Sequence, residues 1–313
     1  MPSFPLTPAL SPIKSDGGEG AKIYRGRFAP SPTGELHFGS LVAALASWLR
    51  ARQQGGEWLV RLEDIDPPRE VPGSAQSILA ALERLGLAAD GPPLYQSRRN
   101  DAYAAALARL HEDGHAFACW CSRAELEAAG TVHRDRRCIF PAHDDRAPAW
   151  RLRVPDLDIA FEDGLQSPQH ENVRDAVGDF VLQRADGLWS YQLACVVDDA
   201  FQGVTEVVRG ADLLDSTPRQ ILLQRLLGLP TPAYLHLPLA VDSSGHKLSK
   251  STDAPAVDAR DPRLTIASAL RFLGQPVPDA PDIATMLHTA ARSFDPRALR
   301  GIASRAADPY MPR

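Results

Sequence analysis

The sequence has no run of about 18 consecutive apolar residues, the length that a membrane-spanning helix needs. Its best apolar stretch, residues 41–49, is short and contains Ser47. Residues 1–20 lack a charged start followed by an apolar core, and their Pro, Ser and Gly content predicts a flexible tail instead of a secretion signal. We therefore expect a cytoplasmic protein with no membrane partner. We also expect a monomer.

Strong positive charge and abundant cysteine are also lacking. The 39 acidic residues outnumber the 34 Lys and Arg, giving a net charge of −5. This balance does not indicate a nucleic-acid partner, although a local basic face would be enough to bind one. Four cysteines in 313 residues are too few for a disulfide scaffold. Because Cys119, Cys121 and Cys138 lie close together, whereas Cys195 lies alone in an apolar run, the cluster indicates a metal site.

The apolar pattern predicts an α/β fold with a parallel sheet, because strands and helices alternate. The first expected elements are strands at 23–28 and 57–62 and helices at 40–53, 74–85 and 102–110. Between about 117 and 178, cysteine, Arg and Asp become dense and short β-like runs such as 150–154 replace the helices, which indicates an insertion. The alternation then resumes at 180–183, 191–197 and 204–209, with helices at 217–227 and 264–272.

A Pro/Gly loop after the first strand carries the first chemical signal. It reads Arg27-Phe-Ala-Pro-Ser-Pro-Thr-Gly-Glu-Leu-His37-Phe-Gly39-Ser40. Glycine lets the backbone approach a flat ring or a phosphate, and the N–H groups of the following helix point toward anionic oxygens. His37 can donate to phosphate oxygens as charge builds. Taken alone, such a loop is more often an ordinary turn with a surface histidine.

The second signal is the run His246-Lys247-Leu248-Ser249-Lys250-Ser251, far along the chain. Two lysines three residues apart, with a hydroxyl residue between them, can wrap a triphosphate and stabilise charge on the α-phosphate and the leaving pyrophosphate. Alone, this run is more often a solvated loop. Two such loops at opposite ends of an α/β chain are specific.

The pair resembles the HIGH-like and KMSKS-like signatures of class I aminoacyl-tRNA synthetases. The surrounding segments RFAPSPTGELHFGS, RLEDIDPPR and KLSKS are similar to the glutamyl branch, from about Ile23 to Ser251. The resemblance implies a Rossmann-type parallel sheet with a zinc-containing insertion and a short helical C-terminal segment. The implied segments are a tail (1–20), the first half of the catalytic domain (21–116), the zinc-binding insertion (117–178), the second half with the KLSKS loop (179–251) and the C-terminal helices (252–313).

The resemblance also implies a site for glutamate and for ATP with its Mg²⁺. Residues lining the amino-acid pocket would be Arg27, Phe28, Ala29, Pro30 and Ser31. Glu63 would accept hydrogen bonds from the substrate ammonium, Tyr191 would close the pocket, and Arg209 would pair with the side-chain carboxylate, which a guanidinium matches in two-point geometry. The ATP residues would be His37, Gly39, Ser40 and Lys250. His37, Lys247 and Lys250 would stabilise charge, with no covalent nucleophile required. Without the family, Glu63 and Arg209 are equally typical of structural ion pairs.

A closed structural zinc site needs a fourth ligand beside Cys119, Cys121 and Cys138. In the family a tyrosine precedes the last cysteine, but this sequence has none there. His133, five residues before Cys138, is an excellent zinc ligand and is the predicted fourth one, with His143 in reserve. The alternative is three unrelated thiols. The site would hold together an insertion too short to build its own core.

Only 62 residues follow Ser251 in this sequence, too few for the anticodon-reading domain of a full-length glutamyl-tRNA synthetase. This shortness resembles the glutamyl-Q tRNA(Asp) synthetases, the family made of the catalytic part alone. That resemblance implies transfer of glutamate to queuosine at the first anticodon position of tRNA(Asp), so the partner would be the anticodon arm. Basic residues of the insertion that could meet phosphate are Arg134, Arg136, Arg137, Arg146, Arg151 and Arg153; Asp135, Asp144 and Asp145 dilute them.

Three alternatives stay open. The first is a short glutamyl-tRNA synthetase that charges a tRNA 3′ end. The second is a nucleotidyltransferase with the same paired loops, although that family gives no reason for Glu63, Tyr191 and Arg209 together. The third is a non-catalytic RNA-binding adaptor, against which the intact lysines argue.

Overall fold

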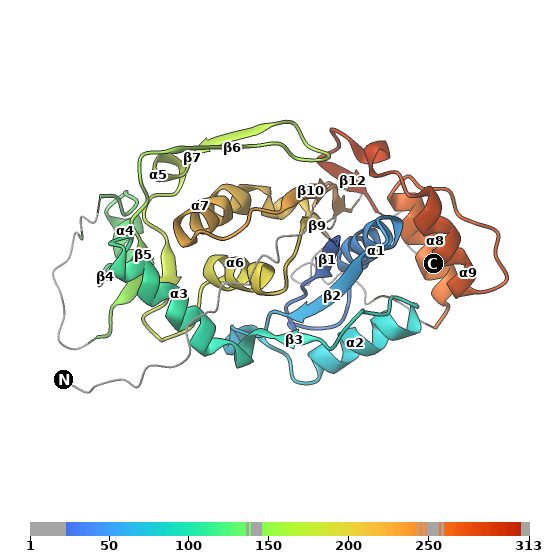
Figure 1. Ribbon diagram of the computed structural model, residues 1–313, viewed down its shortest axis with the longest axis horizontal. Coiled ribbons are helices and arrows are strands. Elements are labelled where there is room, and N and C mark those ends of the chain that lie inside the picture. Colours follow the sequence, from blue (N-terminus) through green and yellow to red (C-terminus); the bar gives the residue numbers. More distant parts are fainter. Residues whose placement is uncertain are drawn as a thin grey trace.

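Parallel strands form the centre of the computed structural model, which describes residues 23–135, 138, 146–242, 244–246, 248, 257 and 260–307 (Figure 1). Strands β1 (Arg25–Phe28), β2 (Glu57–Leu62) and β3 (Leu94–Tyr95) pair in parallel in the order β1-β2-β3. Strands β9 (Glu206–Gly210) and β10 (Ala233–Leu237) form a second parallel pair. The two sets meet where Thr205 N donates to the carbonyl of Arg25 at 2.9 Å, which places β9 beside β1. The predicted parallel α/β fold is confirmed, and the predicted tail at 1–20 lies outside the described residues.

Helices pack around these strands, four of them close to the predicted helices, whereas the helix that begins at Tyr191 covers a run, 191–197, to which the sequence analysis assigns no helix. These helices are α1 (Phe38–Gln53), α2 (Ser74–Arg84), α3 (Asn100–Glu112), α6 (Tyr191–Phe201) and α7 (Thr217–Leu227). Helix α1 begins two residues earlier than predicted because His37 caps it, its Nδ1 accepting from Ser40 N. Helix α7 has the predicted bounds. It starts at a Thr-Pro pair and ends at Gly228, whose φ of 63° is the left-handed conformation that stops a helix.

An antiparallel region replaces the long helices where the sequence predicts an insertion. Strands β4 (Ala116–Cys119), β5 (Ala149–Leu152) and β8 (Val181–Gln183) form one sheet. A separate hairpin joins β6 (Asp158–Phe161) and β7 (Gln169–Asn172), and the short helices are α4 (Arg123–Ala128) and α5 (Val173–Ala176). Because β8 pairs with β5, this sheet continues past residue 178, where the sequence analysis ends the insertion.

The C-terminal segment packs onto the first half of the chain instead of forming its own core. It contains α8 (Pro262–Phe272), α9 (Ile283–Ser293) and β12 (Ser304–Ala306), which pairs in parallel with β11 (Leu239–Val241). The rings of Phe38 in α1 and Phe272 in α8 meet edge to face, 5.6 Å apart. Four 3₁₀ helices complete the secondary structure of the described residues: Pro67–Arg69, Gln96–Arg98, Ala211–Ser216 and Pro296–Leu299.

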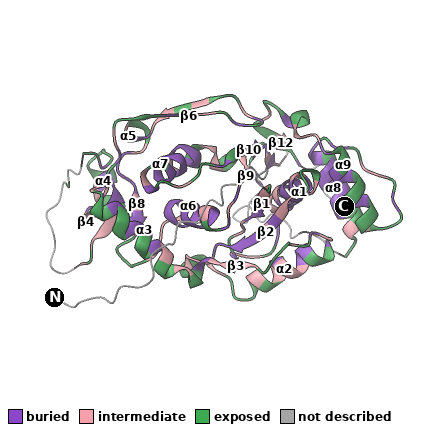
Figure 2. Cartoon of the chain, in the orientation of Figure 1, coloured by how far each residue is buried: buried purple, intermediate pink, exposed green. Residues whose placement is uncertain are grey.

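Two large hydrophobic clusters hold the molecule together, and a small third one surrounds Cys119 and Cys121. One large cluster unites α1, β1, β2, α2, α8 and α9; the other unites α3, α6 and α7 with the antiparallel region. Figure 2 shows α1, α6 and α7 largely buried, whereas α2 exposes its outer face. Among the helices that the structure describes, none has both the length and the apolar character needed to cross a bilayer.

Candidate active site and metal centre

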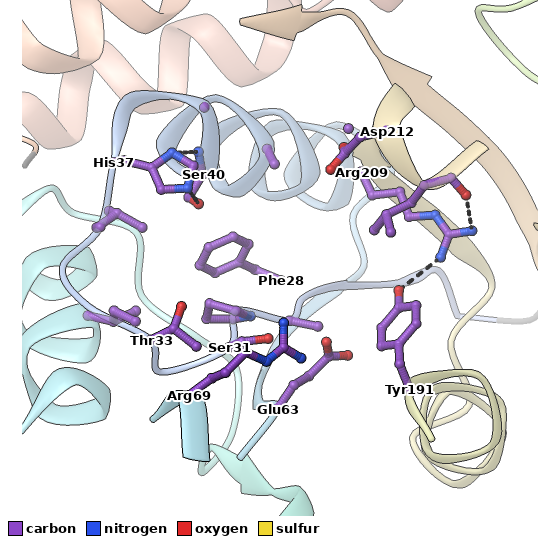
Figure 3. Close-up of a pocket in the computed structure, with 18 of the residues that line it drawn as sticks. Phe28, Ser31, Thr33, His37, Ser40, Glu63, Arg69, Tyr191, Arg209 and Asp212 are labelled. Carbon is purple, nitrogen blue, oxygen red and sulfur yellow. Dashed lines mark hydrogen bonds between the residues drawn. The ribbon is translucent and has the colours of Figure 1, made fainter. Parts of the chain in front are cut away.

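A cavity of about 660 Å³ opens where β1, β2 and β9 end. Three segments that are far apart in sequence form most of its wall: the loop after β1, the residues directly after β2, and the end of β9. The carboxyl ends of parallel strands are the usual place for ligands in open α/β sheets. Figure 3 shows His37 and Arg209 at opposite ends of this cavity, with Phe28 between them.

Every predicted substrate or nucleotide residue within the described ranges lines this one cavity. They are Arg27, Phe28, Ala29, Pro30, Ser31, His37, Gly39, Ser40, Glu63, Tyr191 and Arg209. Lys247 and Lys250 lie outside the described residues. Leu248, between them, is described; it lines the cavity and its N donates to the carbonyl of Ala240 at 2.8 Å. The individual roles of these residues stay predictions.

The guanidinium of Arg209 is held by neutral partners. Its Nη1 donates to the hydroxyl of Tyr191 at 3.3 Å, its Nη2 to Oγ1 of Thr217 at 2.8 Å, and its Nε to Nε2 of His236 at 3.0 Å. Arg209 is 5% exposed, and within the described residues no carboxylate lies at ion-pair distance from it. A nearly buried cation without a counter-charge favours an anionic ligand beside it.

Glu63 supplies an acidic group in the same cavity, beside a buried network of charges. Its Oε1 accepts from Nη2 of Arg61 at 3.5 Å. Oδ1 of Asp199 accepts from Arg61 Nη1 at 2.7 Å and from Arg27 Nε at 3.1 Å. Burial raises the pKa of Glu63, although the charges of Arg61 and Arg27 oppose the shift. The carboxylate would therefore gain from a cationic ligand.

His37 lies at the amino end of α1. Its Nδ1 accepts from Ser40 N at 3.3 Å, so a neutral ring carries its proton on Nε2, 2.9 Å from Oγ of Ser40. That proton is directed at Oγ of Ser40, at the amino end of α1 where the helix N–H groups point. An anion bound here would be stabilised by the positive end of the helix dipole, and it would replace Oγ of Ser40 as the acceptor of the imidazole N–H.

Several charged or aromatic residues of the wall were not singled out by the sequence analysis: Glu35, Asp66, Arg69, Arg184, Trp189 and Asp212. Asp66 and Arg69 pair with each other, their Oδ2 and Nε 2.6 Å apart. Both belong to RLEDIDPPR, which the resemblance already contained, whereas Arg184 and Trp189 lie in a turn with no recognisable motif.

The four predicted zinc ligands lie together in the antiparallel region. One ligand atom from each of Cys119, Cys121, His133 and Cys138 lies within 4.8 Å of every other. Nε2 of His133 is buried and makes no hydrogen bond to any described group, while its Nδ1 lies 2.9 Å from Oδ2 of Asp179. A histidine that bonds a carboxylate through one nitrogen presents the other to a metal. Three sulfurs and this nitrogen fit a tetrahedral structural zinc site, and His143 lies outside the described residues.

Three of the four predicted phosphate-binding arginines that the structure describes make contacts within the protein. Arg134 donates to the carbonyls of Arg174 and Asp175, and Arg146 pairs with Glu125. Arg151 is buried and donates to the carbonyls of Asp179 and Cys121. Arg153 is exposed, and Arg136 and Arg137 lie outside the described residues. The described arginines therefore act mainly as internal supports.

Comparison with known proteins decides the family. The family model for the catalytic domain of class I tRNA synthetases (E and Q) matches residues 24–299. The glutamyl-Q tRNA(Asp) synthetase of Xanthomonas axonopodis pv. citri (strain 306) is 55% identical over 280 residues, covering 88% of this chain and 92% of that protein. The chain belongs to the glutamyl-Q tRNA(Asp) synthetase family.

Further relatives agree with this membership. The glutamyl-Q tRNA(Asp) synthetase of Burkholderia cenocepacia (strain HI2424) is 55% identical over 262 residues, covering 80% of this chain and 88% of that protein. A glutamate-tRNA synthetase from Elizabethkingia anophelis has a similar structure, with a TM-score of 0.77 and 26% identity. The match covers 91% of this chain but 68% of that synthetase. The class I synthetase fold, the ligase class and the glutamyl branch predicted from the sequence are confirmed.

Membership in the glutamyl-Q tRNA(Asp) synthetase family favours the glutamyl-Q interpretation over the three alternatives, which share the class I fold and are separated by assays below. It agrees with the cavity, whose wall contains both the loop after β1 and Leu248 from the second signature run.

Proposed function

We propose that this protein activates L-glutamate with ATP and transfers the glutamyl group to queuosine at the first anticodon position of tRNA(Asp). In the first step the substrate α-carboxylate attacks the α-phosphorus, forming glutamyl-adenylate and releasing pyrophosphate. In the second step a hydroxyl of the modified base attacks the acyl carbon and AMP leaves. The relatives named glutamyl-Q tRNA(Asp) synthetase support the acceptor.

The observation that carries the amino-acid specificity is that one cavity contains both a guanidinium, on Arg209, and a carboxylate, on Glu63, which form no ion pair with each other. Arg209 offers an unneutralised guanidinium, and Glu63 a buried carboxylate, at separate positions of the wall (Figure 3). Glutamate has a matching anionic side chain and a cationic ammonium group. Glutamine would leave the buried guanidinium without a counter-charge, which costs affinity.

The activation step then needs positioning more than covalent chemistry. With the ammonium at Glu63 and the side-chain carboxylate at Arg209, the α-carboxylate points toward the His37 end of the cavity. His37 and the N–H groups of α1 would stabilise charge on the phosphates, together with Lys247, Lys250 and the Mg²⁺ that accompanies ATP. The reaction requires no protein nucleophile.

The insertion has a supporting role in this proposal. Zinc held by Cys119, Cys121, His133 and Cys138 would supply a structural cross-link across residues 117–178. We infer that the ion takes no part in the chemistry, since the cluster shares no residue with the cavity wall.

Two assays test the proposal in sequence. Glutamate-dependent exchange of pyrophosphate into ATP without RNA is expected, and its absence would overturn the activation step. Labelled glutamate should then enter tRNA(Asp) that contains queuosine and not unmodified tRNA(Asp), and nuclease digestion followed by mass spectrometry should place it on the anticodon nucleoside. Charging of the 3′ end of tRNA(Glu) would instead favour the short glutamyl-tRNA synthetase, and exchange that does not need glutamate would favour a nucleotidyltransferase.

A further inference from the structure

The turn between β6 and β7, residues 162–168, reaches from the antiparallel region to the back of the active-site wall. Figure 1 shows this hairpin running alongside α7 toward β10. Asp163 forms a parallel bridge with Tyr234, and Gly164 N donates to the carbonyl of Tyr234 at 2.8 Å. The turn therefore joins the edge of β10 next to His236.

Residues 163–166 hold His236 through both its backbone and its ring. Oδ1 of Asp163 accepts from His236 N at 3.2 Å, and Oδ2 of Asp163 lies 2.6 Å from Nδ1 of the ring. Nε2 of Gln166 donates to the carbonyl of His236 at 2.8 Å. The side chains of Asp163 and His236 are both fully buried. Because the turn contacts the backbone N–H, the carbonyl and the ring of His236, the imidazole has a single orientation.

These contacts also determine the protonation of the ring. Nε2 of His236 accepts from Nε of Arg209 and lies 3.2 Å from Oγ1 of Thr217, so the proton of the neutral ring is on Nδ1, where Asp163 accepts it. Burial lowers the pKa of His236, and the charge of Arg209 adds to this effect while Asp163 opposes it. Burial opposes the ionisation of Asp163, but hydrogen bonds from His236 and from the N–H groups of Gln166 and Leu165 outweigh it and lower its pKa. The pair is an anionic carboxylate and a neutral imidazole.

The direction of the guanidinium follows from this arrangement. A hydrogen bond at Nε fixes the plane of Arg209, because Nε is the donor nearest the flexible stem. Thr217 accepts from Nη2, and Nη1 remains turned toward Tyr191 and the cavity (Figure 3). The other tautomer of His236 would place an N–H against Nε of Arg209 and force the guanidinium to rotate.

We propose that Asp163 and His236 are positioning residues that aim the Arg209 guanidinium at the side-chain carboxylate of the amino-acid substrate. The pair touches neither substrate nor ATP and acts only through Arg209. This inference rests on the proposed glutamate activation. It assigns a specificity-determining role to residues outside the signature loops, one of them in the β6–β7 turn.

Kinetics of pyrophosphate exchange test the pair, with the KM for glutamate and the KM for ATP measured separately. His236→Ala should raise the glutamate KM about tenfold, the typical value of one charge-assisted hydrogen bond, and leave the ATP KM within about twofold. It should also reduce the preference for glutamate over glutamine. His236→Gln should recover part of the loss, because its amide oxygen can accept from Nε of Arg209. Asp163→Asn should resemble His236→Ala, because the tautomer is no longer enforced.

The control is His111→Gln, which removes an exposed imidazole whose Nδ1 lies 3.1 Å from the carbonyl of Ala116. It should leave both KM values unchanged. A merely structural role predicts that the glutamate and ATP constants rise together and that selectivity is kept, which would overturn the inference. An unchanged glutamate KM in folded His236→Ala would do the same. If His236→Ala does not fold, Asp163→Asn and His236→Gln provide the same comparison. If the unmodified protein shows no glutamate-dependent exchange, it is the proposed function that fails.

Discussion

Nε of Arg27 donates to Oδ1 of Asp199 at 3.1 Å, although 172 residues separate the two in sequence. Arg61 donates to the same oxygen at 2.7 Å, so one carboxylate balances two buried guanidinium groups. This contact links β1 to α6 and fixes Arg27 in the cavity wall.

Replacing Asp199 by Asn should destabilise the protein strongly. The substitution leaves buried Arg27 without its carboxylate and Arg61 with Glu63, 3.5 Å away, as its remaining carboxylate among the described residues, so we expect a loss of about 3–5 kcal/mol in the free energy of unfolding, measured with urea. Asp113→Asn is the matched control, because Asp113 pairs with Arg109 at 3.9 Å on the exposed face of α3 and should cost less than about 1 kcal/mol. Equal stability of the two variants would contradict this account of Asp199.

The contribution of Asp199 should also depend on pH. Burial alone would raise the pKa of Asp199, but Arg27 and Arg61 outweigh it and lower the pKa to about 2. A lowered pKa in the folded state means stability that is present above about pH 3.9, the ordinary value, and is lost as the pH falls toward 2. Urea unfolding between pH 2 and 5 should therefore show the difference between the native protein and Asp199→Asn shrinking as the pH falls.

Arg209→Lys should weaken glutamate binding even though it keeps the charge. Lysine cannot reach Tyr191, Thr217 and His236 together and offers no two-point contact to a carboxylate. We expect the glutamate KM in pyrophosphate exchange to rise roughly 10- to 100-fold. Tyr191→Phe removes only the acceptor of Nη1 and should cost less. If the Arg209→Lys variant has an unchanged glutamate KM, Arg209 does not bind the substrate carboxylate.

The KM for glutamate should rise as the pH falls through the weakly acidic range. Glu63 accepts the substrate ammonium only when it is ionised, and burial raises its pKa above the ordinary value. Protonation therefore begins at a higher pH than for an exposed glutamate. Exchange kinetics between pH 5 and 8 should show this trend in the native protein, whereas Glu63→Gln should be weak at every pH without the trend. The same slope in both proteins would assign the titration to another group.

Loss of one predicted zinc ligand should release the metal and loosen the insertion. We expect one zinc ion per chain by mass spectrometry of the purified protein, and none after Cys121→Ala or His133→Ala. Both variants should also unfold at lower temperature, since metal binding contributes to folding. Cys195→Ala removes a buried thiol outside the cluster and should retain the zinc. If His133→Ala still contains one zinc ion per chain, another residue is the fourth ligand.

The sequence predicts elements well where local signals agree with burial. Helix α7 has its expected bounds because Thr217 and Pro218 suit a first turn and Gly228 stops the helix. The β6–β7 hairpin was missed because Gln169–Asn172 is wholly polar, and alternation between apolar and polar residues is the main signal for a strand. Its pairing depends on β6 across a turn, which no local pattern encodes.

The residues of the site also fall into those that the sequence predicts and those that it does not. Residues within long motifs, such as His37 and Glu63, could be identified because the motif carries them into the cavity together. His133 was found from its distance along the chain to Cys138 and from ligand chemistry. Asp163 and His236 could not be found, because an isolated aspartate and an isolated histidine acquire meaning only when folding brings them together from 73 positions apart.

The adjacency of β1 and β9 has a consequence for biosynthesis. The ribosome releases β1 long before Thr205 and Glu206 exist to cover its free edge. At a synthesis rate of about 5–20 residues per second, this edge stays unpaired for roughly 10–40 seconds before β9 has been synthesised. During that interval the nascent N-terminal half offers the unpaired backbone edge of β1 to any other chain, so a chaperone bound near β1 would raise the yield of active enzyme more than one bound near α9.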